Sequence, residues 1–160
     1  MDSMHVDIRV QDRALDALAE TAAVFSGRSS VGGVVSFIGL MRDINAGEEV
    51  TAMTLEHYPG MTEKALAAIV AEAGERWELE AVRVIHRVGE IRPQDPIVLV
   101  AVASRHRGEA FRACEFIIDY LKTRAPFWKR EQTADGRVRW VDARNSDETA
   151  AASWEDAGGR

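Results

Sequence analysis

The fold is decided by the stretch Pro96-Ile97-Val98-Leu99-Val100-Ala101-Val102-Ala103-Ser104-Arg105-His106-Arg107-Gly108, in which an apolar run ends abruptly at a cluster of cations. The apolar part is continuous rather than alternating, so it predicts a central strand that is buried on both faces. A helical pattern follows over residues 109–124, and Pro126 ends it by forcing the preceding residue to be extended. His106 and Arg107 are thus expected at a helix N-terminus, where backbone N–H groups and the helix dipole favour an anion.

Two lysines flank the end of this predicted helix. Lys122 lies in its last turn, and Lys129 lies on the strand predicted after the proline. Alternation along that strand puts Lys129 on the same face as Glu131. We therefore expect both lysines to converge with the His106 cluster on one cleft, where an amine can act as a general base or a nucleophile. The alternative is that both are surface charges, with Lys122 paired to Asp119 and Lys129 paired to Glu131.

The charge distribution favours a small anionic ligand. Residues 105–130 carry seven Arg or Lys and three acids, although the whole chain has a net charge of −6. The overall negative charge argues against a general nucleic-acid binder. Arg42, at the end of a glycine-containing strand, is the best additional anion ligand, and Arg144 is a weaker one. The alternative is that the cations at 105–107 form a solvated turn.

The totals indicate one ordinary globular domain, which we place at residues 1–154, with a disordered tail at 155–160. The chain has 160 residues, of which 46% are hydrophobic and 29% charged. No apolar run approaches the roughly 18 residues that a membrane span needs, and the N-terminus has no secretory pattern. A single cysteine makes a reducing, cytoplasmic setting the default. HExxH, CxxC, Walker and GxGxxG motifs are missing, so we predict no metal and no nucleotide cofactor.

The remaining pattern predicts an α+β fold with two or three helices against a mixed sheet. The pattern predicts strands at 5–10, 51–58, 127–132 and 137–142, a β-rich, glycine-containing segment at 31–42, and one strand or a pair of strands at 81–91. Further helices are expected at 14–24, 62–77 and 146–154, with Asp12 and Thr62 as the N-caps of the first two. Residues 43–49 are expected to be a mobile loop. The core stripe of the 109–124 helix is expected to be Phe111, Cys114, Ile118, Leu121 and Ala125.

Three side chains that could carry chemistry are predicted to be structural instead. Cys114 lies in the apolar stripe of its helix, and a buried cysteine usually behaves as a small hydrophobe. His57 and His86 lie within predicted strands. We therefore expect no nucleophilic thiol.

Three long motifs resemble the large, catalytic subunits of molybdopterin synthase. They are Leu55-Glu56-His57-Tyr58-Pro59-Gly60-Met61-Thr62-Glu63-Lys64-Ala65-Leu66, His86-Arg87-Val88-Gly89-Glu90, and Asp119-Tyr120-Leu121-Lys122-Thr123-Arg124-Ala125-Pro126-Phe127-Trp128-Lys129-Arg130-Glu131. The resemblance covers most of the chain, from about residue 31 to about residue 147. It implies an α/β hammerhead fold with a small β subdomain, and a homodimer that binds two small ubiquitin-like sulfur-carrier subunits to give a heterotetramer.

The resemblance also implies a reaction and a set of site residues. The carrier's C-terminal thiocarboxylate enters a pocket and gives sulfur to cyclic pyranopterin monophosphate, and two transfers make the dithiolene of molybdopterin. Lys122 and Lys129 are the implied catalytic residues. The implied substrate-binding residues are Leu40, Met41, Arg42, His106, Arg107, Lys122, Lys129, Arg130, Glu131 and Arg144, the last of which reaches the neighbouring subunit's pocket. A different class of function, a docking module for a ubiquitin-like partner without chemistry, would have no need of the lysine pair.

Overall fold

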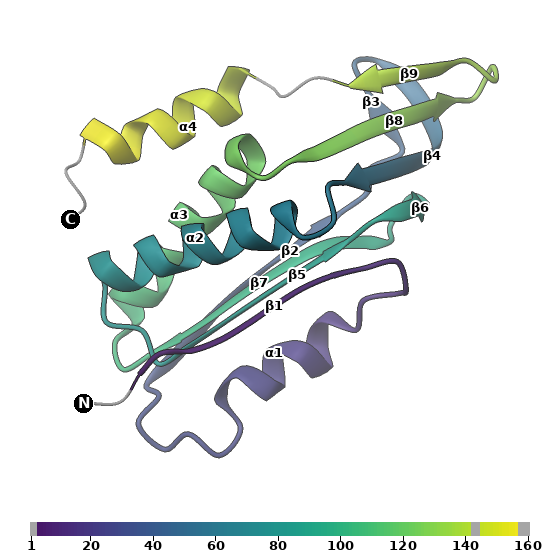
Figure 1. Cartoon of the computed structure of the whole chain (residues 1–160). Coiled ribbons are helices and arrows are strands. Elements are labelled where there is room, and N and C mark those ends of the chain that lie inside the picture. Colours follow the sequence, from purple (N-terminus) through teal and green to yellow (C-terminus); the bar gives the residue numbers. More distant parts are fainter. Residues whose placement is uncertain (1–2, 142–144, 157–160) are drawn as a thin grey trace.

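The computed structural model describes residues 3–141 and 145–156, and its centre is a four-stranded sheet in the order β1-β5-β7-β2 (Figure 1). The strands are β1 (His5–Gln11), β5 (Ala81–Arg87), β7 (Pro96–Ser104) and β2 (Gly33–Leu40). β1 runs parallel to β5, and β7 is antiparallel to both of its neighbours. Residues 98–104 of β7 are all buried, so the prediction of a central strand buried on both faces is confirmed.

A second sheet forms the small β subdomain. Its main strands are β3 (Ile44–Asn45), β4 (Glu48–His57), β8 (Phe127–Thr133) and β9 (Val138–Val141), in that order. β6 (Gly89–Ile91) pairs with β4 and follows β5 after one residue, which ties the second sheet to the first. β8 and β9 form the predicted hairpin, and Gly136 in its turn has the positive φ of +86° that glycine tolerates best.

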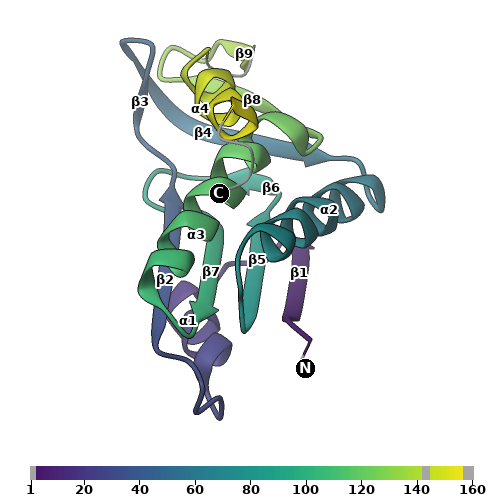
Figure 2. The same cartoon turned by 90° about the vertical axis from the view of Figure 1, so that its left-hand side faces the viewer.

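Helices cover both faces of the first sheet (Figure 2). α1 (Ala17–Phe25) packs on one face, and α2 (Met61–Arg76) and α3 (Arg107–Arg124) pack on the other. The alternation of side chains along each strand causes this division: Ile85 and Leu99 belong to the core under α1, whereas Val84 and Val100 belong to the core under α2 and α3. α4 (Asn145–Asp156) lies on α3. The predicted α+β class is therefore confirmed, with four helices in the described residues.

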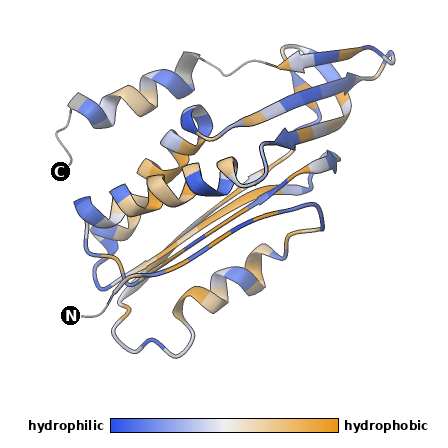
Figure 3. Cartoon of the chain, in the orientation of Figure 1, coloured by the Kyte–Doolittle hydropathy of each residue, from blue (hydrophilic) through white to orange (hydrophobic). Residues whose placement is uncertain are grey.

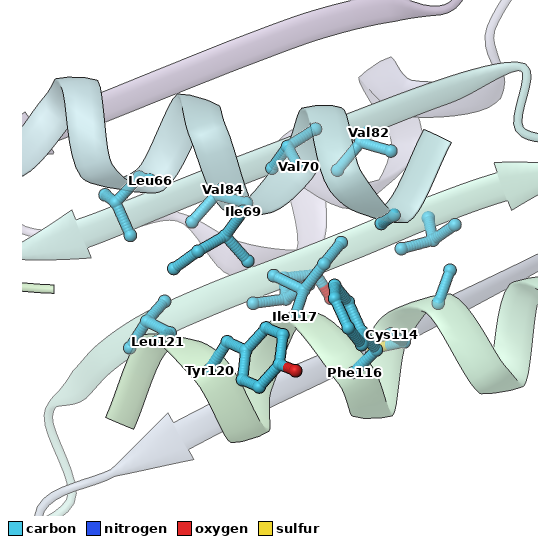
Figure 4. Packing of buried hydrophobic residues seen from close by; sticks show 14 of the residues in the cluster. Leu66, Ile69, Val70, Val82, Val84, Cys114, Phe116, Ile117, Tyr120 and Leu121 are labelled. Carbon is cyan, nitrogen blue, oxygen red and sulfur yellow. The ribbon is translucent and has the colours of Figure 1, made fainter. Parts of the chain in front are cut away.

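The larger core lies between α2, α3 and the sheet. Figure 4 shows Leu66, Ile69 and Val70 of α2 facing Ile117 and Leu121 of α3, with side chains of the sheet in the same cluster. Figure 3 shows apolar residues concentrated on this sheet and its helices, and a more polar β8. The predicted stripe of α3 was partly wrong, because Phe111 is 61% exposed. α3 instead buries a broader face, which packs against both α2 and the sheet and contains Ala110, Ala113, Cys114, Phe116, Ile117, Tyr120 and Leu121.

Three local predictions were wrong. Residues 43–49 are a β3–β4 hairpin rather than a mobile loop, and Ala46 and Gly47 in its turn have φ of 53° and 77°, the left-handed pair that tight hairpins use. α1 begins after Asp16, whose carboxylate accepts from the backbone of Ala19 at 3.1 Å, and not after Asp12. Thr62 lies inside α2, whose N-cap is Gly60.

The C-terminal prediction is tested only in part. α4 continues through Asp156, and residues 157–160 of the predicted tail lie outside the described residues. In the two described ranges, no helix combines the length and apolarity that crossing a bilayer requires.

Candidate active site

A pocket of about 380 Å³ opens where α3 ends and β8 begins. Its walls come from the end of β2, the β3–β4 hairpin, the end of β5, the last turn of α3, the start of β8 and the start of α4. The lining side chains are those of Leu40, Met41, Arg42, Ile44, Asn45, Met53, Leu55, His86, Ile97, Leu121, Lys122, Ala125, Phe127, Lys129, Glu131, Val141 and Asp147. The pocket therefore lies at the junction of the two sheets.

Both predicted catalytic lysines line this pocket. Lys122 is in the last turn of α3, Pro126 breaks the helix, and β8 then brings Lys129 back along the opposite wall. Thr62 fixes this junction, because its hydroxyl donates to the Pro126 carbonyl at 3.0 Å and accepts from the Tyr58 amide at 3.0 Å. The start of α2 is thus fastened to the chain between the two lysines, although Thr62 is not the cap.

Leu40, Met41 and Arg42 line the pocket at the end of β2. The pairing of β2 with β7 shifts its register after Gly39, so Leu40 lies opposite Pro96. The backbone of Met41 is then held on both sides, donating to the Asp95 carbonyl at 3.0 Å and accepting from the Gln94 amide at 2.8 Å. This bracing presents the Arg42 side chain at the pocket while Met41 itself is buried.

Glu131 is a carboxylate whose charge is already compensated. Its side chain is 6% exposed, and it accepts from Arg139 Nε at 3.1 Å and from Asn45 Nδ2 at 2.8 Å. Arg139 also donates to Glu48 at 2.6 Å and to the Asn45 carbonyl at 3.0 Å, so one guanidinium joins β3, β4, β8 and β9. The sequence pattern gave no indication of this role for Arg139, because its three partners are remote in the chain or on other strands.

His86 is a pocket residue that sequence reasoning assigned to the structure alone. It is 4% exposed, lies on the same face of β5 as Val84, and stacks on Phe127 with ring centroids 3.9 Å apart. Its pKa is lowered to about 4, mainly by burial and also by the charges of Lys122, His57 and Lys129, whereas the hydrogen bond with the Arg87 carbonyl opposes the shift. The ring is therefore neutral at pH 7.

Among the described residues, the predicted ligands His106, Arg107 and Arg130 do not line the pocket of their own chain. His106 and Arg107 lie at the N-terminus of α3, which over the 15 residues to Lys122 is about 22 Å away along the helix axis. Arg130 points to the opposite face of β8, where its guanidinium is 5.8 Å from the ring of Trp140. Arg144 lies outside the described residues. The expectation that one cleft of one chain gathers all these cations was therefore wrong.

Cys114 is chemically quiet. It is buried in the core under α3, and its thiol lies 3.7 Å from the Val100 carbonyl. Burial raises its pKa to about 12, so almost no thiolate exists at neutral pH. Cys114 is therefore no nucleophile at neutral pH, as the sequence indicated.

The same motifs and fold recur in known proteins. A family model described as MoaE protein matches residues 10–124. The chain belongs to this family. It is 65% identical over 147 residues to a protein of Ralstonia nicotianae named molybdopterin synthase catalytic subunit, a match that covers 92% of this chain and 83% of that protein. The resemblance found in the sequence is thus confirmed, and with it the class of enzyme.

Solved structures agree with the fold. A molybdopterin biosynthesis MoaE protein from Burkholderia ambifaria MC40-6 is 52% identical and superposes with a TM-score of 0.80, covering 94% of this chain and 98% of that one. A Helicobacter pylori structure, described as a protein–protein complex of subunits 1 and 2 of molybdopterin-converting factor, is 18% identical with a TM-score of 0.64, covering 88% of this chain and 90% of that one. The second likeness concerns the fold alone.

Proposed function

We propose that this chain is the sulfur-transferring subunit of a molybdopterin synthase, and that the pocket between α3 and β8 is its active site. The substrate is cyclic pyranopterin monophosphate, and the sulfur comes from the C-terminal thiocarboxylate of a small ubiquitin-like carrier. The observation that carries the proposal is the pair Lys122 and Lys129, which line one pocket in a chain of the MoaE family.

The size and charge of the pocket fit this substrate. A volume of about 380 Å³ suits one small molecule. Arg42, Lys122 and Lys129 supply three cations against the carboxylates of Asp147 and Glu131, and the Glu131 charge is compensated by Arg139. The pocket can therefore hold both a phosphate and an anionic thiocarboxylate, and a fixed cation stabilises negative charge more strongly there than in water.

The two lysines divide the chemistry. The thiocarboxylate sulfur is the nucleophile, and the ammonium groups draw it to the pterin side chain, where a C–S bond forms as a C–O bond breaks. Water then cleaves the resulting thioester, so the carrier leaves with an ordinary carboxylate and the sulfur stays on the pterin. One lysine activates the substrate and the other assists proton transfer, each within reach of a ligand in the same pocket. Met41, which is buried, and the partly exposed Leu40 add apolar surface to one side of the pocket.

A homodimer gives His106 and Arg107 a role that one chain cannot provide. Both are exposed at the N-terminus of α3, about 22 Å from Lys122, so they do not reach the pocket of their own chain. We place them, with Arg144, at the pocket of the second copy, where they bind the phosphate or the pterin. Arg130 and Glu131 complete the Lys129 segment, Arg130 from the outer face of β8. The complex with two carriers is a heterotetramer and operates in the cytoplasm.

Isotope labelling tests the reaction. A carrier with a ³⁴S-labelled thiocarboxylate is mixed with this protein and cyclic pyranopterin monophosphate, and the product is analysed by mass spectrometry. We expect molybdopterin that contains the label at both dithiolene sulfurs, and none when the carrier ends in an ordinary carboxylate. Carrier binding without any labelled product would mean that the chain is a docking module and not the enzyme.

A further inference from the structure

The hydroxyl of Thr62 joins three segments of the chain beside the pocket. Thr62 is fully buried. Its Oγ1 donates to the Pro126 carbonyl at 3.0 Å and accepts from the Tyr58 amide at 3.0 Å. Pro126 lies between Ala125 and Phe127, and both of these neighbours line the pocket. The hydroxyl therefore binds the backbone of the short link that connects α3 to β8.

Helix α2 does not use this hydroxyl to cap its own N-terminus. Its N-cap is Gly60, with a φ of +86°, and the Gly60 amide donates to the Glu63 carboxylate at 2.9 Å. The Thr62 amide donates to the Tyr58 carbonyl at 2.9 Å, so residues 58 and 62 exchange two hydrogen bonds. This closed turn holds the hydroxyl in a fixed place, where it donates to Pro126.

The link between α3 and β8 separates the two lysines of the pocket. Because Pro126 has no N–H, it cannot continue the hydrogen bonds of the last helical turn. The Phe127 amide bonds only one turn of the link, donating to the Ala125 carbonyl at 2.9 Å. Lys122 lies four residues before Pro126 and Lys129 three residues after it. A shift of the Pro126 carbonyl therefore changes how the last turn of α3 faces β8, and with it the distance between the two amines.

We propose that Thr62 is a positioning residue for the sulfur transfer, and that its hydrogen bond to the Pro126 carbonyl sets the separation of Lys122 and Lys129. The hydroxyl does not line the pocket, touches no ligand and exchanges no proton during the reaction. Its role is to keep both amines within reach of the same bound molecule. The kinetic part of this proposal rests on the proposed function, whereas the hydrogen bond does not.

Amide hydrogen exchange tests the bond without any reaction. Thr62→Ser keeps the hydroxyl and loses a methyl group, whereas Thr62→Val keeps the shape of the side chain but can neither donate nor accept. We expect the Tyr58 amide to be protected in the natural protein and in the serine variant, and to exchange at least about 10-fold faster in the valine variant. Equal protection in all three proteins would overturn the proposal.

Single-turnover kinetics then test the positioning. We expect Thr62→Val to transfer sulfur about 10-fold to 100-fold more slowly than the natural protein at saturating carrier and pterin, because misplaced amines meet the reacting atoms less often. Thr62→Ser should keep the natural rate although its lost methyl group makes it less stable. A serine variant as slow as the valine variant, or a valine variant at the natural rate, would reduce Thr62 to a packing residue.

Thr133→Val is the matched control for the loss of a buried hydroxyl. Thr133 is 3% exposed and donates to the Arg137 carbonyl at 3.2 Å. It lies at the other end of β8 from Pro126 and does not line the pocket, so the control should lose stability and keep the natural rate. A control as slow as Thr62→Val would show that lost stability lowers the rate, and would contradict the proposal.

Two further outcomes remain decisive. If Thr62→Val does not fold, Thr62→Ala takes its place, because the smaller side chain leaves room for a water molecule to pair with the Pro126 carbonyl; a natural rate in Thr62→Ala overturns the proposal, and a rate at least about 10-fold lower supports it. If the natural protein forms no molybdopterin, the proposed function fails and the kinetic role of Thr62 fails with it, whereas the exchange result for Tyr58 still stands.

Discussion

Replacing Arg139 by alanine should loosen the wall of the pocket that carries Glu131 and Asn45. The Arg139 guanidinium donates to Glu131 at 3.1 Å, to Glu48 at 2.6 Å and to the Asn45 carbonyl at 3.0 Å. Without it, the Glu131 carboxylate keeps the Asn45 side-chain amide as its remaining donor among the bonds described. The variant therefore leaves a buried charge only partly compensated.

The cost can be estimated from burial. Removing one partner of a fully buried ion pair costs roughly 3–5 kcal/mol. The Glu131 side chain is 6% exposed, but the Arg139 side chain is 32% exposed, so water can enter the space that the guanidinium leaves. We therefore expect a loss of about 2 kcal/mol in the free energy of unfolding. For a chain of this length, that lowers Tm by about 4–8 °C.

Urea unfolding at pH 7, followed by circular dichroism, measures the loss directly. Arg137→Ala is the matched control on the same hairpin, since the Arg137 side chain is 64% exposed and its pairs with Glu48 and Asp135 are screened by water and should contribute little to stability. Glu131→Gln introduced into Arg139→Ala should restore part of the stability, because an amide is easier to bury than a carboxylate. A loss no larger than that of Arg137→Ala, or no coupling in the double variant, would refute this account of the network.

Three further results are expected. An equal mixture of Lys122→Ala and Arg107→Ala subunits should regain about a quarter of the natural transfer rate, because about half of the randomly paired dimers are mixed and one of the two pockets in each mixed dimer has both residues; no recovery would mean that Arg107 does not act on the neighbouring pocket. The pKa of His86 is 6.5 in the unfolded chain and about 4 in the folded protein. Its contribution to stability, about 3 kcal/mol, is therefore complete above pH 6.5 and is lost as the pH falls towards 4. The free energy of unfolding should differ less between pH 7 and pH 4.5 in His86→Gln than in the natural protein, and an equal difference contradicts the shift. Cys114 should resist iodoacetamide in the folded protein and react after unfolding, and rapid labelling of the native state would contradict its burial.

The sequence was informative where a pattern acts over short distances. The continuous apolar run at 97–103 predicted the central strand, and Pro126 predicted the break that returns Lys129 towards Lys122. Alternation along β8 correctly separated Glu131 from Arg130. Each of these predictions depends only on the chemistry of neighbouring residues, and the structure has them as expected.

Other features depend on contacts between remote segments and could not be read in this way. His106 and Arg107 lie at the N-terminus of α3, as predicted. The length of the helix separates them from Lys122, so they do not line the pocket of their own chain. Phe111 is apolar yet exposed, because the buried face of α3 is set by where α2 and the sheet lie. His86 lies in a strand and was predicted to be structural. It also lines the pocket, because α3 and β8 bring their pocket residues to the end of β5, and the sequence pattern does not show this.

The most direct test of the central claim is a single-turnover measurement. Purified protein is mixed with cyclic pyranopterin monophosphate and an excess of thiocarboxylated carrier, and the amount of molybdopterin is followed over time for Lys122→Ala, Lys129→Ala and the control Lys64→Ala, which removes an exposed lysine of α2. We predict that the control forms product at the natural rate, and that both pocket variants fold and bind the carrier but lose at least about 100-fold in rate. Product formation at the natural rate in both pocket variants would contradict the claim that this lysine pair is the catalytic centre.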